Sequence, residues 1–390
     1  MMSRNNPQID YLINRRYADF RHGTGVQIKL FAGQLAQNPL HICWDVERSV
    51  SDTYQPVRNL NTSLLKAWPF KRGRGLVARM ETKLGLTWHD QQRITRRVKQ
   101  FTRPGTGKPR AYVIVASEEE AKIARQILGV LDAEYIVNVM DYLHLGETEL
   151  PELPEFAAIL KGAKKIFALT PPIQTVLARI SARPDISILG VARESANKQS
   201  RAFISGIKPF QIVMMGSVDY RRGLQELHKF CERLDKVGVN YCLNYIGTKA
   251  MRDRLGTRLP VNYCGVRLGV ERDALLNSMH LAYLPGPDGN PADDYLARFS
   301  FPSRTTDYFW HGLPVIGPLF DDSATAQMVG ALRGKGVWFS QDAGELGAVV
   351  KNLTQNPKMW EAASEAVCDF AQKNFSIART AEAILQAFEN

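Results

Sequence analysis

The amino-acid sequence predicts an α/β fold with two doubly wound, mostly parallel sheets. The chain has 390 residues, which is too long for one ordinary core and suits two domains. Short β-branched and apolar runs alternate along it with longer amphipathic runs, the pattern of strand–helix–strand units. This alternation stops in the polar stretch 190–208 and restarts at the apolar run 210–215. The restart indicates a second sheet.

Five apolar runs predict the strands of the first domain, near 40–46, 111–116, 134–139, 165–169 and 185–189. Longer amphipathic runs between them predict helices near 24–37, 117–129, 154–162 and 171–182. The strand runs at 111–116, 134–139 and 165–169 are each followed by a helical run, as a parallel sheet requires.

The second half repeats this scheme with clearer signals. Apolar residues recur at helical spacing over 223–237, directly after the strand-like run FQIVMMG. The remaining strands are predicted near 241–246, 261–265, 280–284, 314–316 and 336–339, and two last helices near 357–373 and 376–389. We therefore expect a first domain at 1–205 and a second at 206–375, with the C-terminal helix 376–390 packing back on the first.

Composition excludes several classes of protein. No apolar run approaches the roughly 20 residues that a spanning helix needs, and charges interrupt the first 20 residues too early for a secretory signal. The five cysteines are an odd number and form no CxxC pair, so we interpret them as buried thiols rather than disulfides or a zinc site. A cytoplasmic globular protein is expected.

The net charge of +11 comes from one segment. Residues 66–110 hold thirteen of the 50 basic side chains and only two of the 39 acidic ones, so the rest of the chain is balanced. A clustered basic surface attracts an anionic partner, either nucleic acid or lipid headgroups. Trp68, Phe70, Trp88 and Phe101 stand among these cations. This mixture suits an amphipathic element at an anionic bilayer, but a solvated flap with packed tryptophans explains it equally well.

Four blocks of the second half carry the most specific signals. In order, they are IVMMG (212–216) followed by Arg221-Arg222-Gly223, NYIGTKAMRDRL (244–255), NYCGVRLGVERDALLNSMHLAYLPG (262–286) and FPSRTTDYFWHGLPVIG (301–317). Each block resembles a motif of glycosyltransferase family 4. The last one is similar to that family's P-S-K-x-x-E-Y-x-A-x-G-x-P-V-I. The resemblance covers about 210–390 well, and the first half only in topology.

The resemblance implies the GT-B fold, two Rossmann-like domains that face each other across a cleft. It also implies a hexosyltransferase-like enzyme that transfers a sugar from a nucleotide diphosphate sugar to a hydroxyl group. Family members that build lipopolysaccharide or lipid-linked oligosaccharide use a basic surface of the N-terminal domain to reach lipid-anchored acceptors. For this chain, the resemblance implies a lipid-linked or cell-surface glycan acceptor and a place at the inner face of the cytoplasmic membrane. We therefore expect a peripheral, metal-independent, retaining enzyme of polysaccharide biosynthesis, with the nucleotide sugar as co-substrate and no other cofactor.

The block 301–317 contains residues whose chemistry suits a nucleotide. A helix start offers N–H groups and partial positive charge to phosphates, and Ser303 is placed to cap it. Arg304 in the first turn opposes the helix dipole, which favours an anionic partner. By resemblance, Asp307 takes the place of the family's ribose-binding glutamate, while Thr305 lies beside the phosphates. A surface ion pair between Arg304 and Asp307 is the alternative.

Other donor-site residues follow from the same resemblance. Arg222 matches the family's lysine and would stabilise the leaving diphosphate, with Arg221 beside it. The remaining candidates are the strand-end residues Gly216, Gly247, Gly265 and Val266. Ordinary strand-end turns explain the glycines about as well.

The first half offers weaker candidates for the acceptor site. Gly23 and Gly25 resemble a glycine turn that lets backbone approach the donor phosphates, although Ile28 breaks the GxGxxG pattern. Asp141 and His144 follow a predicted strand, where either side chain is placed to orient or deprotonate an acceptor hydroxyl. A helix cap and a loop histidine are the simpler interpretation of this pair.

One departure from the family pattern limits these expectations. Retaining members commonly carry a second carboxylate eight positions before the ribose ligand, but Phe299 stands there. The donor-sugar contact therefore does not carry over. Two alternative functions stay open, a nucleic-acid-modifying glycosyltransferase and a non-catalytic GT-B binding protein. A GT-B epimerase or phosphorylase is a third, but it needs further active-site residues that the sequence does not reveal.

Overall fold

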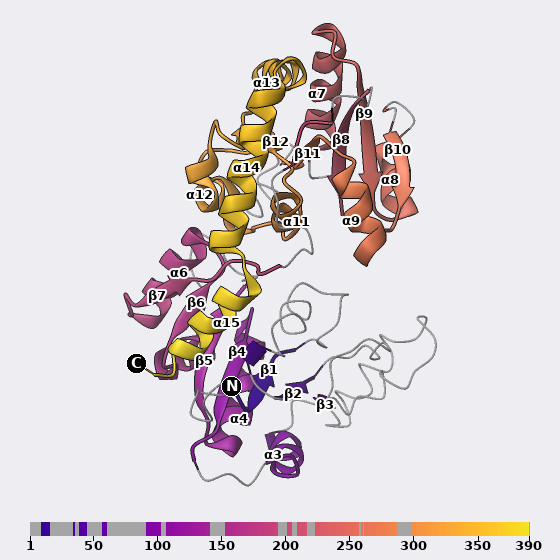
Figure 1. Ribbon diagram of the computed structural model, residues 1–390. Coiled ribbons are helices and arrows are strands. Elements are labelled where there is room, and N and C mark those ends of the chain that lie inside the picture. The colour runs from indigo at the N-terminus through magenta and orange to yellow at the C-terminus, as the bar shows by residue number, and fades with distance from the viewer. Residues whose placement is uncertain are drawn as a thin grey trace, which may run out of the picture. The chain divides into compact units, whose positions relative to one another are not determined.

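The computed structural model describes residues 9–15, 34–35, 39–44, 57–60, 91–102, 107–140, 153–193, 201–204, 209–216, 223–256, 259, 261–286 and 298–389 (Figure 1). The chain divides into two compact units. The first unit comprises 1–169, 173–190 and 377–390, and the second comprises 170–172 and 191–376. The predicted boundary after residue 205 differs from this division, because 191–204 group with the second unit. Side chains of this segment explain the difference, because Arg193 and Arg201 both contact residues of the second unit.

The first unit contains, among its described residues, a seven-stranded sheet in the order β3-β2-β1-β4-β5-β6-β7 with all neighbours parallel. Its strands are β1 (Tyr11–Ile13), β2 (Leu40–Cys43), β3 (Val57–Asn59), β4 (Arg110–Ile114), β5 (Glu134–Val139), β6 (Ile166–Ala168) and β7 (Ile186–Ile188). Its helices are α3 (Gln91–Lys99), α4 (Glu118–Leu131), α5 (Pro154–Gly162), α6 (Pro171–Ser181) and the C-terminal α15 (Ile377–Gln386).

The sequence predicted most of these elements within a few residues. The strands β1 and β3, with three residues each, were not among those predicted, nor was α3, where Ile94 and Val98 are the only described side chains that are buried. Two apolar residues in nine give a weak helical pattern. The helix expected at 24–37 lies outside the described residues except for 34–35, which are helical.

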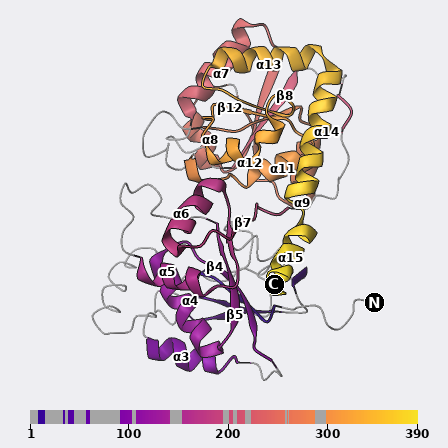
Figure 2. The same ribbon diagram turned by 90° about the vertical axis from the view of Figure 1, so that its left-hand side faces the viewer.

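Side chains fix where α4 and α5 begin. Ser117 caps α4 by accepting the amide hydrogen of Glu120. The carboxylate of Glu118 accepts from the amides of Glu155 and Phe156, at 2.9 and 2.8 Å. The first turn of α4 therefore caps the neighbouring helix α5, since these amides have no partner within α5 itself. Figure 2 shows α3, α4 and α5 in one layer beside the sheet.

The second unit contains a six-stranded sheet in the order β10-β9-β8-β11-β12-β13, counted over the residues that the structure describes. Its strands are β8 (Phe210–Met215), β9 (Tyr241–Ile246), β10 (Val261–Gly265), β11 (Leu281–Tyr283), β12 (Val315–Gly317) and β13 (Val337–Phe339), and neighbouring strands run parallel. Its helices are α7 (Leu224–Lys236), α8 (Lys249–Leu255), α9 (Gly269–Asn277), α11 (Arg304–Trp310), α12 (Ala324–Met328), α13 (Ala343–Gln355) and α14 (Pro357–Asn374).

A core of buried side chains holds α7 and α13 against one face of this sheet. Phe230 of α7 stacks on Tyr283 of β11, with ring centroids 5.0 Å apart, and Val350 of α13 joins the same cluster. The first strands of this unit, β8 to β10, succeed one another on one side, and β11 to β13 on the other. The direction of winding thus reverses between β8 and β11. The carboxyl edge at such a point is where open α/β sheets bind ligands.

The basic segment 66–110 is described only at 91–102 and 107–110. Within α3, Arg96 and Lys99 are exposed, and Arg97 donates to the carbonyl of Leu60. The aromatic residues Trp68, Phe70 and Trp88 lie outside the described residues, so the expected amphipathic element remains a prediction. Among the described helices, none is at once long enough and apolar enough to span a bilayer.

Candidate functional site

Three side chains fix the carboxyl end of β8, next to the reversal point. The hydroxyl oxygen of Tyr308 accepts the amide hydrogen of Met215 at 2.8 Å. Arg304 donates from Nη1 to the carbonyl of the same residue. The hydroxyl of Tyr245 donates to the carbonyl of Gly216 at 2.8 Å. Burial raises the pKa of both tyrosines, so both hydroxyls keep their protons at neutral pH. The guanidinium of Arg304 is thus held at the edge where the sequence predicted a diphosphate.

The conformation of Gly216 explains the glycine at this strand end. Its φ of +84° lies in the left-handed region, and a Cβ atom there would come within 3.3 Å of Nη1 of Arg304. Gly247 is constrained differently, because a Cβ atom would clash with the hydroxyl of Tyr245. Gly265 ends β10 with φ +75° and open space around it, and the following Val266 is 57% exposed. These four predicted donor residues therefore lie at the carboxyl ends of three neighbouring strands.

Backbone segments approach one another unusually closely at the same edge. A Cβ atom on Gly223, the residue before α7, would lie closer than 3.0 Å to the carbonyl oxygen of Gly286. A Cβ atom on Gly286 would in turn clash with the carbonyl of Pro318, and one on Gly317 with that of Leu284. Only glycine permits this packing. It brings the start of α7 against the segment that follows β11.

The start of α11 differs from the prediction. Ser303 stands at the cap position, but its φ and ψ are helical and its side chain makes no capping bond, so the predicted cap is wrong. The amides of Thr305 and Thr306 donate to the carbonyls of Pro302 and Ser303 instead. Thr305 is fully buried, and its hydroxyl has no hydrogen bond within the described part of the chain. A tight first turn thus uses two of the N–H groups that were expected to face a phosphate.

Replacing Ser303 tests this correction. Ser303→Ala is expected to change the free energy of unfolding by less than about 0.5 kcal/mol, because no capping bond is lost. Ser323→Ala is the matched comparison, since Ser323 caps α12 by accepting from the amide of Ala326. Loss of that bond is expected to cost about 1 kcal/mol. Equal losses in urea titrations of the two variants would show that Ser303 caps its helix after all.

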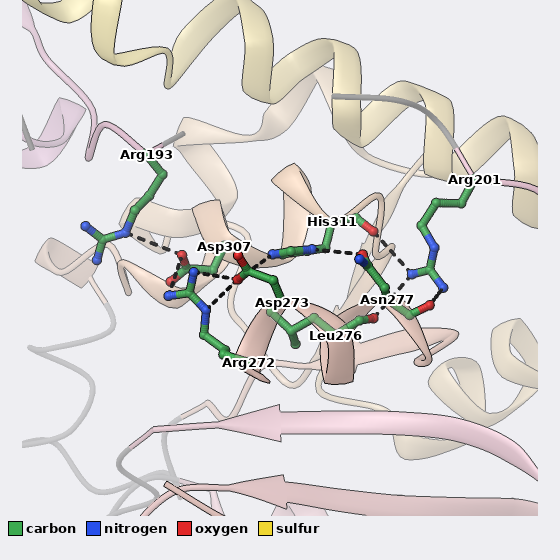
Figure 3. Close-up of polar contacts among 8 residues, drawn as sticks. All are labelled: Arg193, Arg201, Arg272, Asp273, Leu276, Asn277, Asp307 and His311. Atoms are coloured by element: carbon green, nitrogen blue, oxygen red, sulfur yellow. Dashed lines mark hydrogen bonds and ion pairs between the residues drawn. The ribbon is translucent and has the colours of Figure 1, made fainter. Parts of the chain in front are cut away.

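Asp307 lies buried between two arginines (Figure 3). Its Oδ1 atom is 3.4 Å from Nε of Arg193 and 3.5 Å from Nη1 of Arg272. Burial lowers the pKa of Arg272, but the charges of Asp307 and Asp273 outweigh it, so this pKa is raised. The alternative of an exposed pair between Arg304 and Asp307 does not describe this carboxylate, whose side chain is 10% exposed and turned to other arginines.

The arrangement continues into a partly buried polar network. Arg272 donates to Asp273 from Nε and Nη2, and Asp273 lies 3.3 Å from Nε2 of His311. The other ring nitrogen of His311 is 3.0 Å from the amide oxygen of Asn277. Arg201 closes the far side by donating to the carbonyls of Leu276, Asn277 and His311. The network therefore joins α9, α11 and the segment 191–204 (Figure 3).

Two buried histidines of the second unit predict how its stability depends on pH. In His280, Nδ1 accepts the amide hydrogen of Gln211 and Nε2 faces the carbonyl of Ile204, so the neutral ring fits its surroundings. Burial lowers the pKa of both His280 and His311. The unfolded chain then binds protons more readily than the folded one, so stability is lost as pH falls through about 6.5, the ordinary histidine value.

We expect the urea midpoint to fall between pH 7.5 and pH 5.5. His280→Gln, which cannot take up a proton at this position, is expected to show a shallower fall. A variant whose midpoint declines as steeply as that of the unaltered protein would contradict the assignment to His280.

Sequence reasoning missed the basic residues that surround Asp307. Arg193 is far from it in the chain, and Arg272 sits in an ordinary Glu-Arg-Asp run of α9. No local pattern pairs them with a carboxylate on α11. Six predicted site residues lie outside the described residues: Gly23, Gly25, Asp141, His144, Arg221 and Arg222. Their predicted roles stay predictions.

Comparison with known proteins identifies the fold. No protein-family model and no curated protein matches the sequence. Solved structures match over nearly the whole chain. Anabaena HepE in complex with UDP and glucose has a TM-score of 0.64 at 11% identity, covering 98% of this chain and 100% of that one. Sucrose-phosphate synthase from Thermosynechococcus elongatus has a TM-score of 0.65 at 13% identity, covering 98% of both chains.

A third match is the lipopolysaccharide outer core galactosyltransferase WaaB, with a TM-score of 0.59 at 10% identity over 98% of both chains. Together these matches confirm the α/β prediction of two Rossmann-like domains of the GT-B class. Sequence identities this low establish the fold alone, and function has to be argued from the residues at the site.

Proposed function

We propose that this chain is a glycosyltransferase that uses a nucleotide diphosphate sugar as donor. The observation that carries the proposal is the guanidinium of Arg304, fixed against the carbonyl of Met215 at the point where the second sheet reverses its winding. A cation held at this edge suits a diphosphate, whose two negative charges need basic partners. The structural neighbour HepE was solved in complex with UDP and glucose, which supports the same substrate class.

In the proposed donor complex, the diphosphate lies beside Arg304, and the ribose lies near Asp307. Arg221 and Arg222 follow the fixed end of β8 in the sequence and supply further positive charge. Since Arg193 and Arg272 contact Oδ1 of Asp307, we propose that the ribose hydroxyls donate to Oδ2. Basic side chains then take the role that a metal ion has in other glycosyltransferases.

The reaction forms a bond between the acceptor oxygen and the anomeric carbon of the donor sugar. The bond from this carbon to the diphosphate breaks, and its electron pair leaves with the diphosphate, which the arginines stabilise. The proton of the acceptor hydroxyl passes to a base, for which we propose Asp141 or His144 in the first unit. Retention of configuration follows from the family resemblance and is part of the proposal.

Nucleotide binding tests the proposal directly. In a thermal-shift panel of UDP, GDP, TDP, CMP and their sugars, we expect the nucleotides of one base to raise the unfolding temperature. UDP is tried first because the structural neighbour HepE was solved in complex with UDP and glucose. A ligand at 100 times its dissociation constant stabilises by about 2.7 kcal/mol. Arg304→Met is expected to weaken the binding of nucleoside diphosphates about tenfold or more, which corresponds to a loss of about 1.4 kcal/mol or more. The affinity for the nucleoside, which has no phosphate, is expected to stay unchanged. The absence of any shift across the panel would refute the donor assignment.

For the acceptor, we propose a lipid-linked or cell-surface glycan approached through the basic segment 66–110. The concentration of the whole charge excess in this segment supports an anionic surface as partner. Flotation with vesicles that contain or lack anionic lipid tests whether the protein binds an anionic membrane surface such as the inner face of the cytoplasmic membrane. Duplex DNA is the comparison, and binding to DNA alone, falling steeply with salt, would favour a nucleic-acid-modifying enzyme instead.

Phe299 favours a second candidate, a GT-B protein that binds nucleotide sugars without turning them over. The carbonyl of Phe299 accepts from the hydroxyl of Thr170, and its side chain offers no carboxylate to a donor sugar. Release of free nucleotide from the donor that binds in the panel separates the two candidates. Binding without release, even with a mixture of glycan acceptors, would favour the non-catalytic protein.

A further inference from the structure

The helical layer of the first unit contains a polar cavity that plays no part in the donor site. The cavity has a volume of about 430 Å³ and lies between α3, α4 and α5, a size typical of small-molecule sites. Its lining residues are Thr95 of α3, then Lys122, Arg125, Gln126, Gly129 and Val130 of α4, and Glu155 of α5.

One face of α4 forms most of the wall. Lys122, Arg125, Gln126 and Gly129 follow at spacings of three, one and three residues, so their side chains lie along the same side of the helix. A Cβ atom on Gly129 would meet nothing within 4 Å, so this glycine leaves the cavity open. Such a position has no structural need of glycine, because alanine favours a helix by up to about 1 kcal/mol.

The groups that face the cavity are mainly hydrogen-bond donors. Lys122 is exposed and has no ion pair or hydrogen bond within the described part of the chain. Arg125 forms an ion pair with Glu155, the one carboxylate in the lining. Thr95 adds a hydroxyl from α3, a helix that carries Arg96 and Lys99 on its exposed side and contains no acidic residue. Lys122 thus has no carboxylate within ion-pair distance among the described residues.

We propose that this cavity binds a phosphate group, with Lys122 as its principal partner. A compact ammonium group is a common ligand of phosphate, and the free N–H groups of Arg125 and the hydroxyl of Thr95 can add hydrogen bonds. Glu155 opposes the anion and sets its affinity, because it neutralises Arg125. A phospholipid headgroup and a soluble phosphate ester share this chemistry, and both are tested below. The proposal does not rest on the donor site, which lies in the second unit.

Two single substitutions with opposite expected effects test the cavity on the full-length protein. Lys122→Gln is expected to weaken binding about tenfold, the factor that 1.4 kcal/mol represents. Glu155→Gln releases Arg125 and is expected to strengthen binding severalfold. Lys161→Gln is the matched control, because Lys161 is an exposed lysine of α5 that does not line the cavity. Gly129→Leu fills the open space with a good helix former and is expected to abolish binding without unfolding the helix.

The probes are glycerol 3-phosphate, measured by calorimetry, and vesicles of phosphatidylcholine with or without phosphatidylglycerol, measured by flotation. Changes with glycerol 3-phosphate alone would identify a soluble ester, and changes with phosphatidylglycerol vesicles alone would identify a lipid headgroup. Both results support a phosphate site. Equal effects of Lys122→Gln and Lys161→Gln would overturn it in favour of general charge attraction, and so would no effect of Lys122→Gln or Glu155→Gln on either probe. Nucleotide affinity, measured on the same variants, is expected to stay unchanged. Failure of the phosphate proposal would therefore leave the donor assignment untouched.

Discussion

Asp307→Ala is expected to lower the free energy of unfolding by about 3 kcal/mol, the lower end of the cost of removing one partner from a buried ion pair. The substitution leaves Arg193 without the carboxylate it contacts and deprives Arg272 of one of its two acidic neighbours. If Asp307 only bound the ribose, as the sequence resemblance implies, this variant would lose nucleotide affinity and keep its stability. The buried position of the carboxylate corrects that expectation, because stability and affinity should now fall together.

Urea unfolding measures the first effect, with Asp321→Ala as control. Asp321 pairs with Arg333, but both side chains are more than half exposed, at 67% and 61%. Such a surface pair contributes at most about 1 kcal/mol. Asp307→Glu separates the role of the carboxylate in stability from its role in nucleotide affinity, since it restores the family's residue and keeps the negative charge. If Asp307→Ala unfolds at the same urea concentration as Asp321→Ala, the pairing with Arg193 and Arg272 has no energetic weight.

Gly223→Ala is the second substitution with a large expected effect. The φ of Gly223 is +80°, which strains any residue with a side chain, and the new Cβ atom would also clash with the backbone of Gly286. Because the obstacle is backbone, no rotamer change relieves it. Strain and overpacking together are expected to cost about 3 kcal/mol, and the start of α7 should move away from the segment after β11.

Gly330→Ala provides the comparison for this prediction. Gly330 has no positive φ, and a Cβ atom there would meet nothing within 4 Å. Its replacement is expected to change the free energy of unfolding by no more than about 0.5 kcal/mol. If Gly223→Ala matches Gly330→Ala in both urea midpoint and nucleotide affinity, the close approach at Gly286 does not determine the shape of this edge.

The sequence predicted the fold class because the signals for it are local. The strands β8 and β9 are short apolar runs, each followed by a helix, and both were predicted with the bounds that the structure shows. Two helices of that unit were missed. The five residues of α12 are too short for a periodic pattern, whereas Leu346, Val350 and Leu353 of α13 have helical spacing that was present in the sequence and overlooked.

The candidate site was less predictable because its chemistry depends on distant partners. The side chains that hold Met215 and Gly216 come from β9 and α11, and the arginines beside Asp307 come from α9 and the segment 191–204. A single sequence contains no signal for such pairings. Ser303 shows the opposite case, since a residue type that favours helix caps stands at a cap position and does not act as one.

The anchoring of β8 has a practical consequence for dissecting this protein by mutagenesis. Tyr245, Arg304 and Tyr308 secure the end of β8, and none of the three belongs to the segment 217–222 that follows this strand in the sequence, so the anchoring does not depend on Arg221 or Arg222. Removing the charge of either arginine is therefore expected to leave the anchors of β8 in place. A loss of activity in an Arg222→Ala variant would then reflect a lost contact to the substrate rather than a disturbed fold. Asp307→Ala does not allow this distinction, because it is expected to lower stability and affinity together.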